Sequence, residues 1–438
     1  MVLSTRKRSA LFAAAAALTL VGALAGCRGQ STNTTTTEAG MKTDIGVTKE
    51  ACPNAIDKTK GCIYLGTISD LTVGPFAPLA VPITKAQAAF WNRVNKAGGI
   101  GGYEIDVSKY VKDNKYNPQT HNEVYQEIKP NILALAQTLG SPTTAAIIDD
   151  LKENNIVAVP ASWTSAWAFE DVILESGANY CVESMNAIDY EKTRNAALKS
   201  VMTVHYAGDY GDDAAAGVKY AAGKLGLTFT DVKTDPGADK QAGAVAAIIS
   251  GKPDLVILTT APTEAATIVG LAAVGGFKGH FIGTSPTWNP ALNGSAAAPA
   301  LAALYLQSGP WQSWGADTPG HKAMREALTP TPSPLSDGYT AGWVWSYPLK
   351  AALEKAAANK DLTRAGLLAA AKSLTSVDYE GMLPAGSGNY AAGPDKGAVR
   401  VTVISKPDKT APTGVTEVQK PTVGPTAQGF SLTKACYK

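Results

Sequence analysis

Hydroxyl side chains gather at two points of the sequence where an apolar run of strand length ends. The segment LGSPTT, residues 139–144, follows the apolar run 132–136, and the segment ASWTS, residues 161–165, follows the next apolar run. Free backbone N–H groups at a helix start, together with serine and threonine hydroxyls, can hold an anion such as a carboxylate. The alternative is that Ser141 merely caps a helix. Two such segments after neighbouring strands favour a binding site over a cap.

The sequence lacks the common motifs of enzyme chemistry. The nucleophile turn GxSxG, the phosphate loop GxxxxGK[ST] and the zinc motif HExxH do not occur. The glycine-rich segment 98–102 follows a helical pattern rather than a strand, which is typical of a turn. No CxxC pair occurs, and the four histidines show no ligand spacing. We therefore expect no enzyme, no cofactor and no metal site, and without a long basic run we expect no nucleic acid partner.

The elements that must position these hydroxyls alternate along the chain between strand-like and helix-like runs. Strands are expected at 63–68, 103–111, 132–137, 156–160, 201–206, 228–233, 254–259, 280–283 and 399–405. Helices are expected at 81–97, 119–128, 142–154, 189–198, 212–225, 241–250, 264–274, 318–328, 338–358 and 362–374. The tail 412–438 is rich in Pro and Thr, and we expect no regular structure there.

Strands that alternate with helices predict an α/β fold with parallel sheets and right-handed crossovers. In such folds ligands bind beyond the carboxyl ends of the strands, which is where both hydroxyl-rich segments fall. The chain has 438 residues, of which 45% are hydrophobic, so it is long enough for two such sheets.

The N-terminus has the pattern of an export signal. Three basic residues at 6–8 precede a mostly apolar run at 10–25, which is short for a membrane-spanning helix. The run ends in LAGC, where small residues precede Cys27 as lipoprotein processing requires. We expect a lipoprotein signal peptide over 1–26, a lipid on Cys27 and a flexible tether over 27–50; the alternative is an ordinary secretory signal with a chance cysteine. Cleavage would change the formal net charge from +2 to −1.

Four cysteines follow Cys27, namely Cys52, Cys62, Cys181 and Cys436. An even number in an exported protein indicates disulfides. Four cysteines allow three pairings. We favour Cys52–Cys62, which closes a short loop rich in turn-forming residues, and Cys181–Cys436 is then the second pair.

The order of several short motifs resembles the periplasmic binding proteins of the leucine/isoleucine/valine-binding type. These motifs are KAGGIGG at 96–102, the loops at 140–141 and 160–165, DYG at 209–211 and KPD at 252–254. The resemblance implies two doubly wound parallel-sheet lobes joined by three crossovers, with the ligand between them. We assign 51–184 plus 309–376 to lobe 1 and 185–308 plus 377–438 to lobe 2.

The resemblance also implies which side chains hold the ligand. A ligand carboxylate would be held by Ser141, Ser162 and Thr164, and Tyr210 corresponds to a tyrosine that the second lobe contributes.

The segment after the strand 280–283 departs from this family pattern. Amino-acid-binding members offer an acid to the ligand ammonium there, whereas this chain has Ser285 and Trp288 and no carboxylate. A buried ammonium without a counter-charge is costly. We therefore expect a ligand with a more apolar body, for which Trp163 and Trp288 would be walls, unless Glu264 or Asp209 supplies the charge.

The function expected from the sequence is that of an extracytoplasmic solute-binding lipoprotein on the outer face of the cytoplasmic membrane. It would bind a small carboxylate- or amide-bearing molecule and deliver it to the permease and ATPase subunits of an ABC importer. One alternative is a protein that binds branched-chain or other amino acids for such an importer. Another is a receptor that senses a ligand without transporting it.

Overall fold

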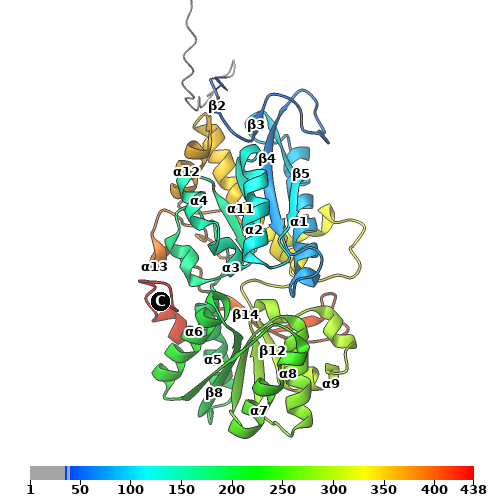
Figure 1. The fold of residues 1–438 in the computed structure, drawn as a ribbon, viewed down its shortest axis with the longest axis vertical. Helices are drawn as coiled ribbons and strands as arrows, with labels where there is room; N and C mark the ends of the chain where they lie inside the picture. The colour runs from blue at the N-terminus through cyan, green and yellow to red at the C-terminus, as the bar shows by residue number, and fades with distance from the viewer. Residues whose placement is uncertain (1–34, 37–39) are drawn as a thin grey trace, which may run out of the picture. The chain divides into compact units, whose positions relative to one another are not determined.

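The computed structural model describes residues 35–36 and 40–438, and residues 40–438 contain two α/β lobes (Figure 1). The expected signal peptide and Cys27 lie outside the described residues. Within the described part of the chain, no helix combines the length and the apolar character needed to cross a membrane.

The sheet of lobe 1 is mainly parallel. Its strand β4 pairs in parallel with β5 and β6, β7 continues the sheet beside β6, and β3 pairs antiparallel with the start of β4. The strands are β3 (Val47–Thr48), β4 (Gly61–Ser69), β5 (Tyr103–Asp113), β6 (Ala134–Leu139) and β7 (Ala158–Ala161). The helices are α1 (Ala77–Lys96), α2 (Pro118–Ile128), α3 (Ser141–Ala145), α4 (Ile148–Glu153), α10 (Pro319–Ala327), α11 (Gly338–Ala358) and α12 (Arg364–Lys372).

The sheet of lobe 2 has the order β15-β14-β12-β11-β10-β8-β9. Strand β14 runs antiparallel to both of its neighbours, β12 and β15. The strands are β8 (Ser200–Tyr206), β9 (Thr228–Thr234), β10 (Leu255–Thr259), β11 (His280–Gly283), β12 (Tyr305–Gly309), β14 (Thr402–Pro407) and β15 (Val415–Thr422). The helices are α5 (Tyr180–Arg194), α6 (Asp209–Leu225), α7 (Ala242–Gly251), α8 (Pro262–Val274), α9 (Ala298–Leu304) and α14 (Pro425–Gln428).

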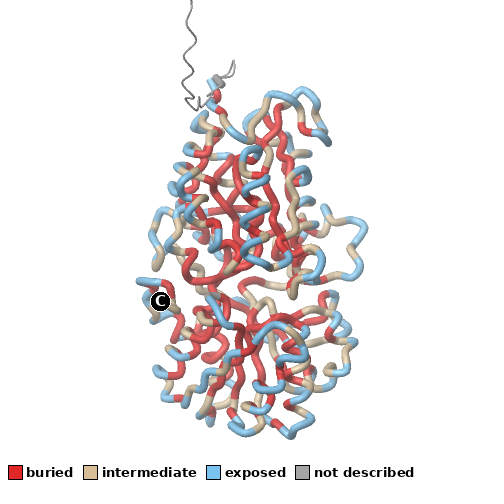
Figure 2. The backbone as a smooth tube through the Cα atoms, viewed as in Figure 1, coloured by how far each residue is buried: buried red, intermediate tan, exposed pale blue. Residues whose placement is uncertain are grey.

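Alternation along the strands explains why each sheet has helices on both faces. In β10, Val256 and Leu258 pack with α7 and α8, whereas Leu255 and Ile257 pack with α5 and α6. Successive side chains of a strand point to opposite faces, so an all-apolar strand needs cover on both sides. Figure 2 shows the resulting buried layer through both lobes.

A separate small sheet has the strand order β1-β2-β13. β1 (Thr35–Thr36) and β2 (Lys42–Thr43) pair antiparallel, and β2 also pairs with β13 (Asp361–Leu362) beside lobe 1. The expected tether over 27–50 is therefore too long, because Met41 is buried in the lobe 1 core and β3 joins the sheet.

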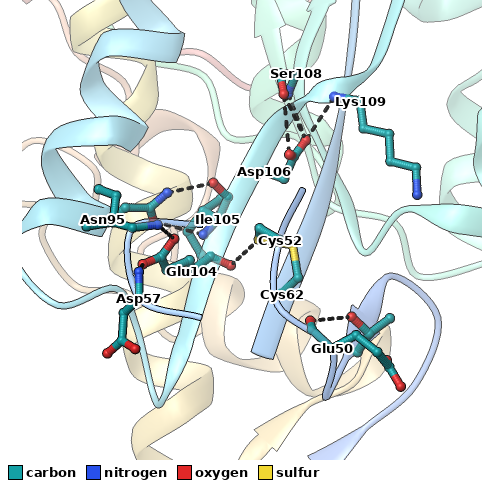
Figure 3. Close-up of a disulfide and its surroundings, with 12 residues drawn as sticks. Glu50, Cys52, Asp57, Cys62, Asn95, Glu104, Ile105, Asp106, Ser108 and Lys109 are labelled. Carbon is teal, nitrogen blue, oxygen red and sulfur yellow. Dashed lines mark hydrogen bonds between the residues drawn. A yellow bond between two sulfur atoms is a disulfide. The ribbon is translucent and has the colours of Figure 1, made fainter. Parts of the chain in front are cut away.

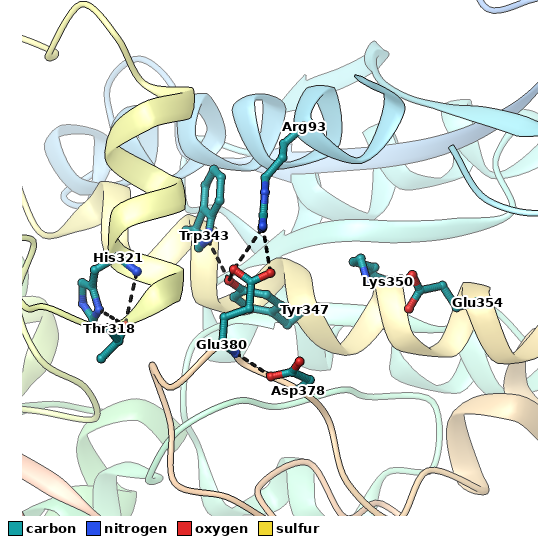
Figure 4. A network of polar contacts seen from close by, with 9 residues as sticks. All are labelled: Arg93, Thr318, His321, Trp343, Tyr347, Lys350, Glu354, Asp378 and Glu380. Atoms are coloured by element: carbon teal, nitrogen blue, oxygen red, sulfur yellow. Dashed lines mark hydrogen bonds and ion pairs between the residues drawn. The ribbon is translucent and has the colours of Figure 1, made fainter. Parts of the chain in front are cut away.

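Two of the three expected lobe boundaries lie a few residues from the points where the chain passes from one lobe to the other. The expected boundary at 184/185 divides α5, which packs as a whole against lobe 2. The boundary at 376/377 is too early, because Glu380 forms an ion pair with Arg93 of α1 at 2.9 Å and accepts a hydrogen bond from Tyr347 of α11 (Figure 4).

Two further expectations about local structure are wrong. The single helix expected over 142–154 is split into α3 and α4, because Thr143 and Thr144 hydrogen-bond with their hydroxyls to carbonyls of the preceding strand and turn. The tail 412–438, for which no regular structure was expected, forms β15 and α14.

The structure contains the disulfides Cys52–Cys62 and Cys181–Cys436, which is the pairing favoured from the sequence. The first closes the loop before β4 (Figure 3). Glu104 of β5 fixes the same loop, since its carboxylate accepts the backbone N–H groups of Ile56 at 2.8 Å and Asp57 at 2.7 Å.

Candidate functional site

The first hydroxyl-rich segment forms a sharp turn between β6 and α3. Gly140 has a φ of 98°, and a Cβ there would lie 2.7 Å from the ring of Tyr116, so glycine is required. Gly140 is the N-cap of α3, and no side chain caps this helix. The Ser141 hydroxyl is buried and has no hydrogen-bond partner. The simple capping interpretation of Ser141 is therefore wrong.

A buried histidine holds this turn in place. Asn114 donates to Nδ1 of His121 at 3.0 Å, and His121 Nε2 lies 3.0 Å from the hydroxyl of Thr138 on β6. Burial lowers the pKa of His121 to about 3, so the ring is neutral and Nε2–H donates to Thr138. Asn114 also donates to the carbonyl of Leu139, directly before the turn.

The second hydroxyl-rich segment follows β7 and leads into a short 3-10 helix, η2 (Ser165–Phe169). The indole N–H of Trp167 donates to the Ser162 hydroxyl at 3.0 Å. The Thr164 hydroxyl is buried without a hydrogen-bond partner, but it is not among the residues that line the cavity described next.

A cavity between the two lobes encloses about 1040 Å³, counted out to its open mouth. Eight aromatic side chains line it: Phe76, Tyr116, Trp163, Tyr180, Tyr210, Trp288, Trp311 and Trp345. Seven serines also line it: Ser141, Ser162, Ser285, Ser308, Ser313, Ser336 and Ser405. Among the described residues of this lining, Asp337 is the one acid, and no lysine, arginine or histidine occurs.

Three tryptophans from different segments form the main aromatic wall. The rings of Trp163 and Trp345 lie 4.6 Å apart, and Trp311 lies 5.4 Å from Trp163 and 5.7 Å from Trp345. Such contacts fix the orientation of each ring. The indole N–H of Trp345 is buried without a partner, whereas that of Trp163 donates to the Ser176 carbonyl. This wall offers a large apolar surface to a ligand.

Tyrosines from both lobes close the cavity beside the Ser141 turn. Tyr210 of α6 lies 6.0 Å from the ring of Phe76 and 4.7 Å from that of Tyr180. The Tyr210 hydroxyl donates to the carbonyl of Thr260 at 3.1 Å. Phe76 in turn lies 4.7 Å from Tyr116, so the two lobes meet through aromatic contacts here.

A buried acid supports the serines of lobe 2. Glu183 of α5 accepts hydrogen bonds from the backbone N–H of Ser285 at 2.9 Å and from its hydroxyl at 3.2 Å. Burial raises the pKa of Glu183 to about 8, so the side chain is mainly neutral at pH 7. Glu183 does not line the cavity itself. Amino-acid-binding members of the family carry an acid after β11. In this chain the carboxyl nearest that segment is Glu183 of α5, which lies behind Ser285 and is largely uncharged.

The acid that does line the cavity, Asp337, stands just before α11. Its carboxylate accepts the backbone N–H of Trp314 at 3.2 Å, and burial raises its pKa to about 6. Glu264, considered above as a source of charge, accepts the backbone N–H of Gly237 instead and does not line the cavity. The side chain of Asp209 lies outside the described residues.

Six of the seven ligand-binding residues expected from the sequence line one cavity: Ser141, Ser162, Trp163, Tyr210, Ser285 and Trp288. Thr164 does not. Sequence reasoning missed Phe76, Tyr116, Tyr180, Trp345, Asp337 and Glu183. The run containing Trp345 is buried on all sides of α11, so its pattern gives no signal of which face meets a cavity.

Comparison with known proteins agrees with this architecture. A family model described as periplasmic binding protein matches residues 63–407. A fatty acid ABC transporter substrate-binding protein from Thermomonospora curvata has a similar structure, with a TM-score of 0.82 and 32% identity over 90% of this chain and 98% of that chain. No curated protein matches the sequence.

Two more distant structures share the fold. A branched chain amino acid ABC transporter protein from Thermus thermophilus with bound valine has a TM-score of 0.70 at 17% identity, over 84% of this chain and 98% of that chain. A possible leucine/isoleucine/valine-binding protein from Rhodopirellula baltica has a TM-score of 0.68 at 16% identity, over 82% of this chain and 96% of that chain.

The two lobes and the cavity between them define a substrate-binding protein. The chain belongs to the periplasmic binding protein family, as its motifs predict. This family comprises extracytoplasmic substrate-binding proteins of ABC transporters rather than enzymes.

Proposed function

We propose that this protein is the lipid-anchored substrate-binding protein of an ABC importer and that its ligand is a fatty acid or a similar aliphatic carboxylic acid. The observation that carries the proposal is the cavity lining, which combines eight aromatic side chains with a buried, unpaired Ser141 hydroxyl. An apolar ligand body suits such walls, and a few hydroxyls suffice to orient a head group. The relative from Thermomonospora curvata, described as a fatty acid transporter protein, supports this ligand class.

In the proposed complex, the carboxylate lies against Ser141 and Ser162 and the chain lies along Trp163 and Trp345. The Ser162 oxygen already accepts the Trp167 N–H, so its own hydroxyl hydrogen can be donated to the ligand. Asp337 disfavours a carboxylate in its part of the cavity, because like charges repel.

A thermal-shift screen tests this function. Protein stripped of bound lipid is mixed with fatty acids, aromatic acids and amino acids. A ligand that binds only the folded state at a hundredfold excess over Kd stabilises it by about 2.7 kcal/mol. Fatty acids are expected to raise the melting temperature. A shift with amino acids alone would contradict the proposal.

The hydroxyl of Ser141 gives a specific prediction. Because it bonds to nothing in the described structure and does not cap α3, Ser141→Ala should leave the stability of the empty protein almost unchanged. Loss of a charge-assisted hydrogen bond costs about 1.5–3 kcal/mol, so fatty acid affinity should fall roughly ten- to a hundredfold. Calorimetric titration measures the fatty acid affinity of wild type and variant.

Thr164→Val is the matched control for that substitution. It also removes a buried, unpaired hydroxyl, but from outside the cavity lining. Wild-type affinity in Thr164→Val together with weak binding in Ser141→Ala would locate the head group. Equal affinities for wild type and Ser141→Ala would remove Ser141 from the proposed site.

The proposed anchor rests on the sequence LAGC at 24–27. Cys27→Ala should abolish lipid attachment and either release the protein from the membrane or leave an unprocessed precursor. Two acyl chains anchor a protein stably, whereas one is marginal. Membrane fractionation and mass measurement of the mature N-terminus check this result. A variant that is still processed and fully membrane-bound would exclude Cys27 as the anchor.

One observation favours a second ligand class. Asp337 is an acid in the cavity wall and offers the counter-charge that the ammonium of a branched-chain or other amino acid would need. In that case Asp337→Asn would weaken the binding of valine. If the ligand is a fatty acid, the same change should leave affinity unaltered or improve it.

A further inference from the structure

A second, outer cavity lies next to the first and shares two of its wall residues. It encloses about 760 Å³ including its open side, and Pro290 and Ser336 line both cavities. The outer walls come from both lobes, namely from α1, from the segments 289–293 and 334–336, and from the segment 409–414 between β14 and β15.

Helix α1 borders both cavities with neighbouring faces. Leu79 and Ile83 line the inner cavity, whereas Pro78 and Pro82 line the outer one. Each pair is four residues apart and therefore lies on one face of the helix. A chain that leaves the inner cavity past Ser336 would thus remain in contact with α1.

Prolines form much of the wall of the outer cavity. Five of the lining residues are prolines, namely Pro78, Pro82, Pro290, Pro334 and Pro412. The amide groups in the wall are already bonded within the protein: Asn289 accepts the N–H of Ala291, and Asn293 donates to the carbonyl of Gly414, both at 2.9 Å. An alkyl chain placed here would leave neither amide without its partner.

We propose that the outer cavity binds the distal part of a long acyl chain whose carboxylate is held in the inner cavity, so that the protein prefers long-chain over short-chain fatty acids. This inference rests on the proposed function and adds chain length to it.

The test is a calorimetric titration of lipid-stripped protein with saturated fatty acids of increasing length. Each buried methylene contributes about 0.8 kcal/mol, or roughly fourfold in affinity. Affinity of the wild type should rise with every added methylene through the long-chain acids. Ala411→Trp, which fills the outer cavity, should bind short acids as wild type does and lose the gain for long ones. Ala411→Ser keeps the cavity open and should behave as wild type.

Other outcomes overturn the inference in different ways. A wild-type affinity that stops rising at short acids, or one that Ala411→Trp leaves unchanged for long acids, would exclude chain binding in the outer cavity. Lys409 is the only ionisable residue among the described ones that line this cavity. A tenfold loss of affinity in Lys409→Met would place the carboxylate there and reverse the orientation. If no fatty acid of any length binds, the proposed function itself fails.

Discussion

Removal of the Cys181–Cys436 disulfide is expected to destabilise the protein far more than removal of Cys52–Cys62. The bond between Cys181 and Cys436 joins residues 255 apart, which in the chain-entropy description corresponds to about 5.5 kcal/mol. The bond between Cys52 and Cys62 spans 10 residues and corresponds to about 3 kcal/mol. Guanidinium unfolding of the two double Cys→Ser variants measures the difference.

The larger disulfide also fixes contacts between the lobes. The backbone N–H of Cys436 donates to the Ser165 hydroxyl at 2.8 Å, and Ser165 of lobe 1 donates from its backbone N–H to Asp213 of α6 at 3.0 Å. Asp213 also accepts the N–H of Cys181 at 3.2 Å. Equal losses of stability in the two double variants would contradict the dependence on loop length that the chain-entropy description gives.

The second large effect concerns Glu183 and the pH dependence of stability. Burial raises the pKa of this carboxyl from its usual 4.5 to about 8. The folded state therefore keeps a proton that the unfolded state loses, and the contribution to stability, fully present below pH 4.5, is lost as pH rises to 8. At about 1.4 kcal/mol for each tenfold change in proton affinity, the loss above pH 8 is roughly 5 kcal/mol.

Glu183→Gln should remove most of this dependence. A glutamine oxygen can still accept from Ser285, while its amide can donate to the buried hydroxyl of Ser308, which lies beside the Glu183 carboxyl. At pH 5 the variant and the wild type should have similar free energies of unfolding. At pH 9 the variant should be more stable by several kcal/mol.

Denaturant titrations at pH 5, 7 and 9 measure this difference. Burial also raises the pKa of Asp337, from its usual 3.8 to about 6, so this carboxyl lowers stability as pH rises from 3.8 to 6. This effect is the same in wild type and Glu183→Gln and does not alter their difference. Parallel pH profiles for wild type and Glu183→Gln would show that Glu183 is ionised in the folded protein and would contradict the account of its burial.

The sequence predicts those helices and strands that have a clear apolar pattern and fails for those that lack one. β11 and α11 have the expected boundaries, 280–283 and 338–358, because an apolar run and a helical period are clear there. β15 was missed, since it is an edge strand with mostly exposed and half-exposed residues such as Lys420 and no apolar run.

Three serines of the cavity were predictable because each stands directly after a strand, whereas Glu183 and Trp345, which lie within helices, were not. Ser141, Ser162 and Ser285 stand just beyond strand ends, so their meeting point follows from the topology. Glu183 meets Ser285 across 102 residues of sequence, and no local pattern signals that contact. The same holds for Trp345, which belongs to a helix that is buried on every side along its first half.

The ligand class is the central claim, and a direct binding measurement tests it most sharply. Lipid-stripped protein is titrated in a calorimeter with hexadecanoate and, separately, with valine. The account predicts saturable binding of one hexadecanoate per chain with a negative heat-capacity change, as burial of apolar surface requires, and no heat of binding with valine. Saturable binding of valine without binding of hexadecanoate would contradict the account and identify an amino-acid-binding protein.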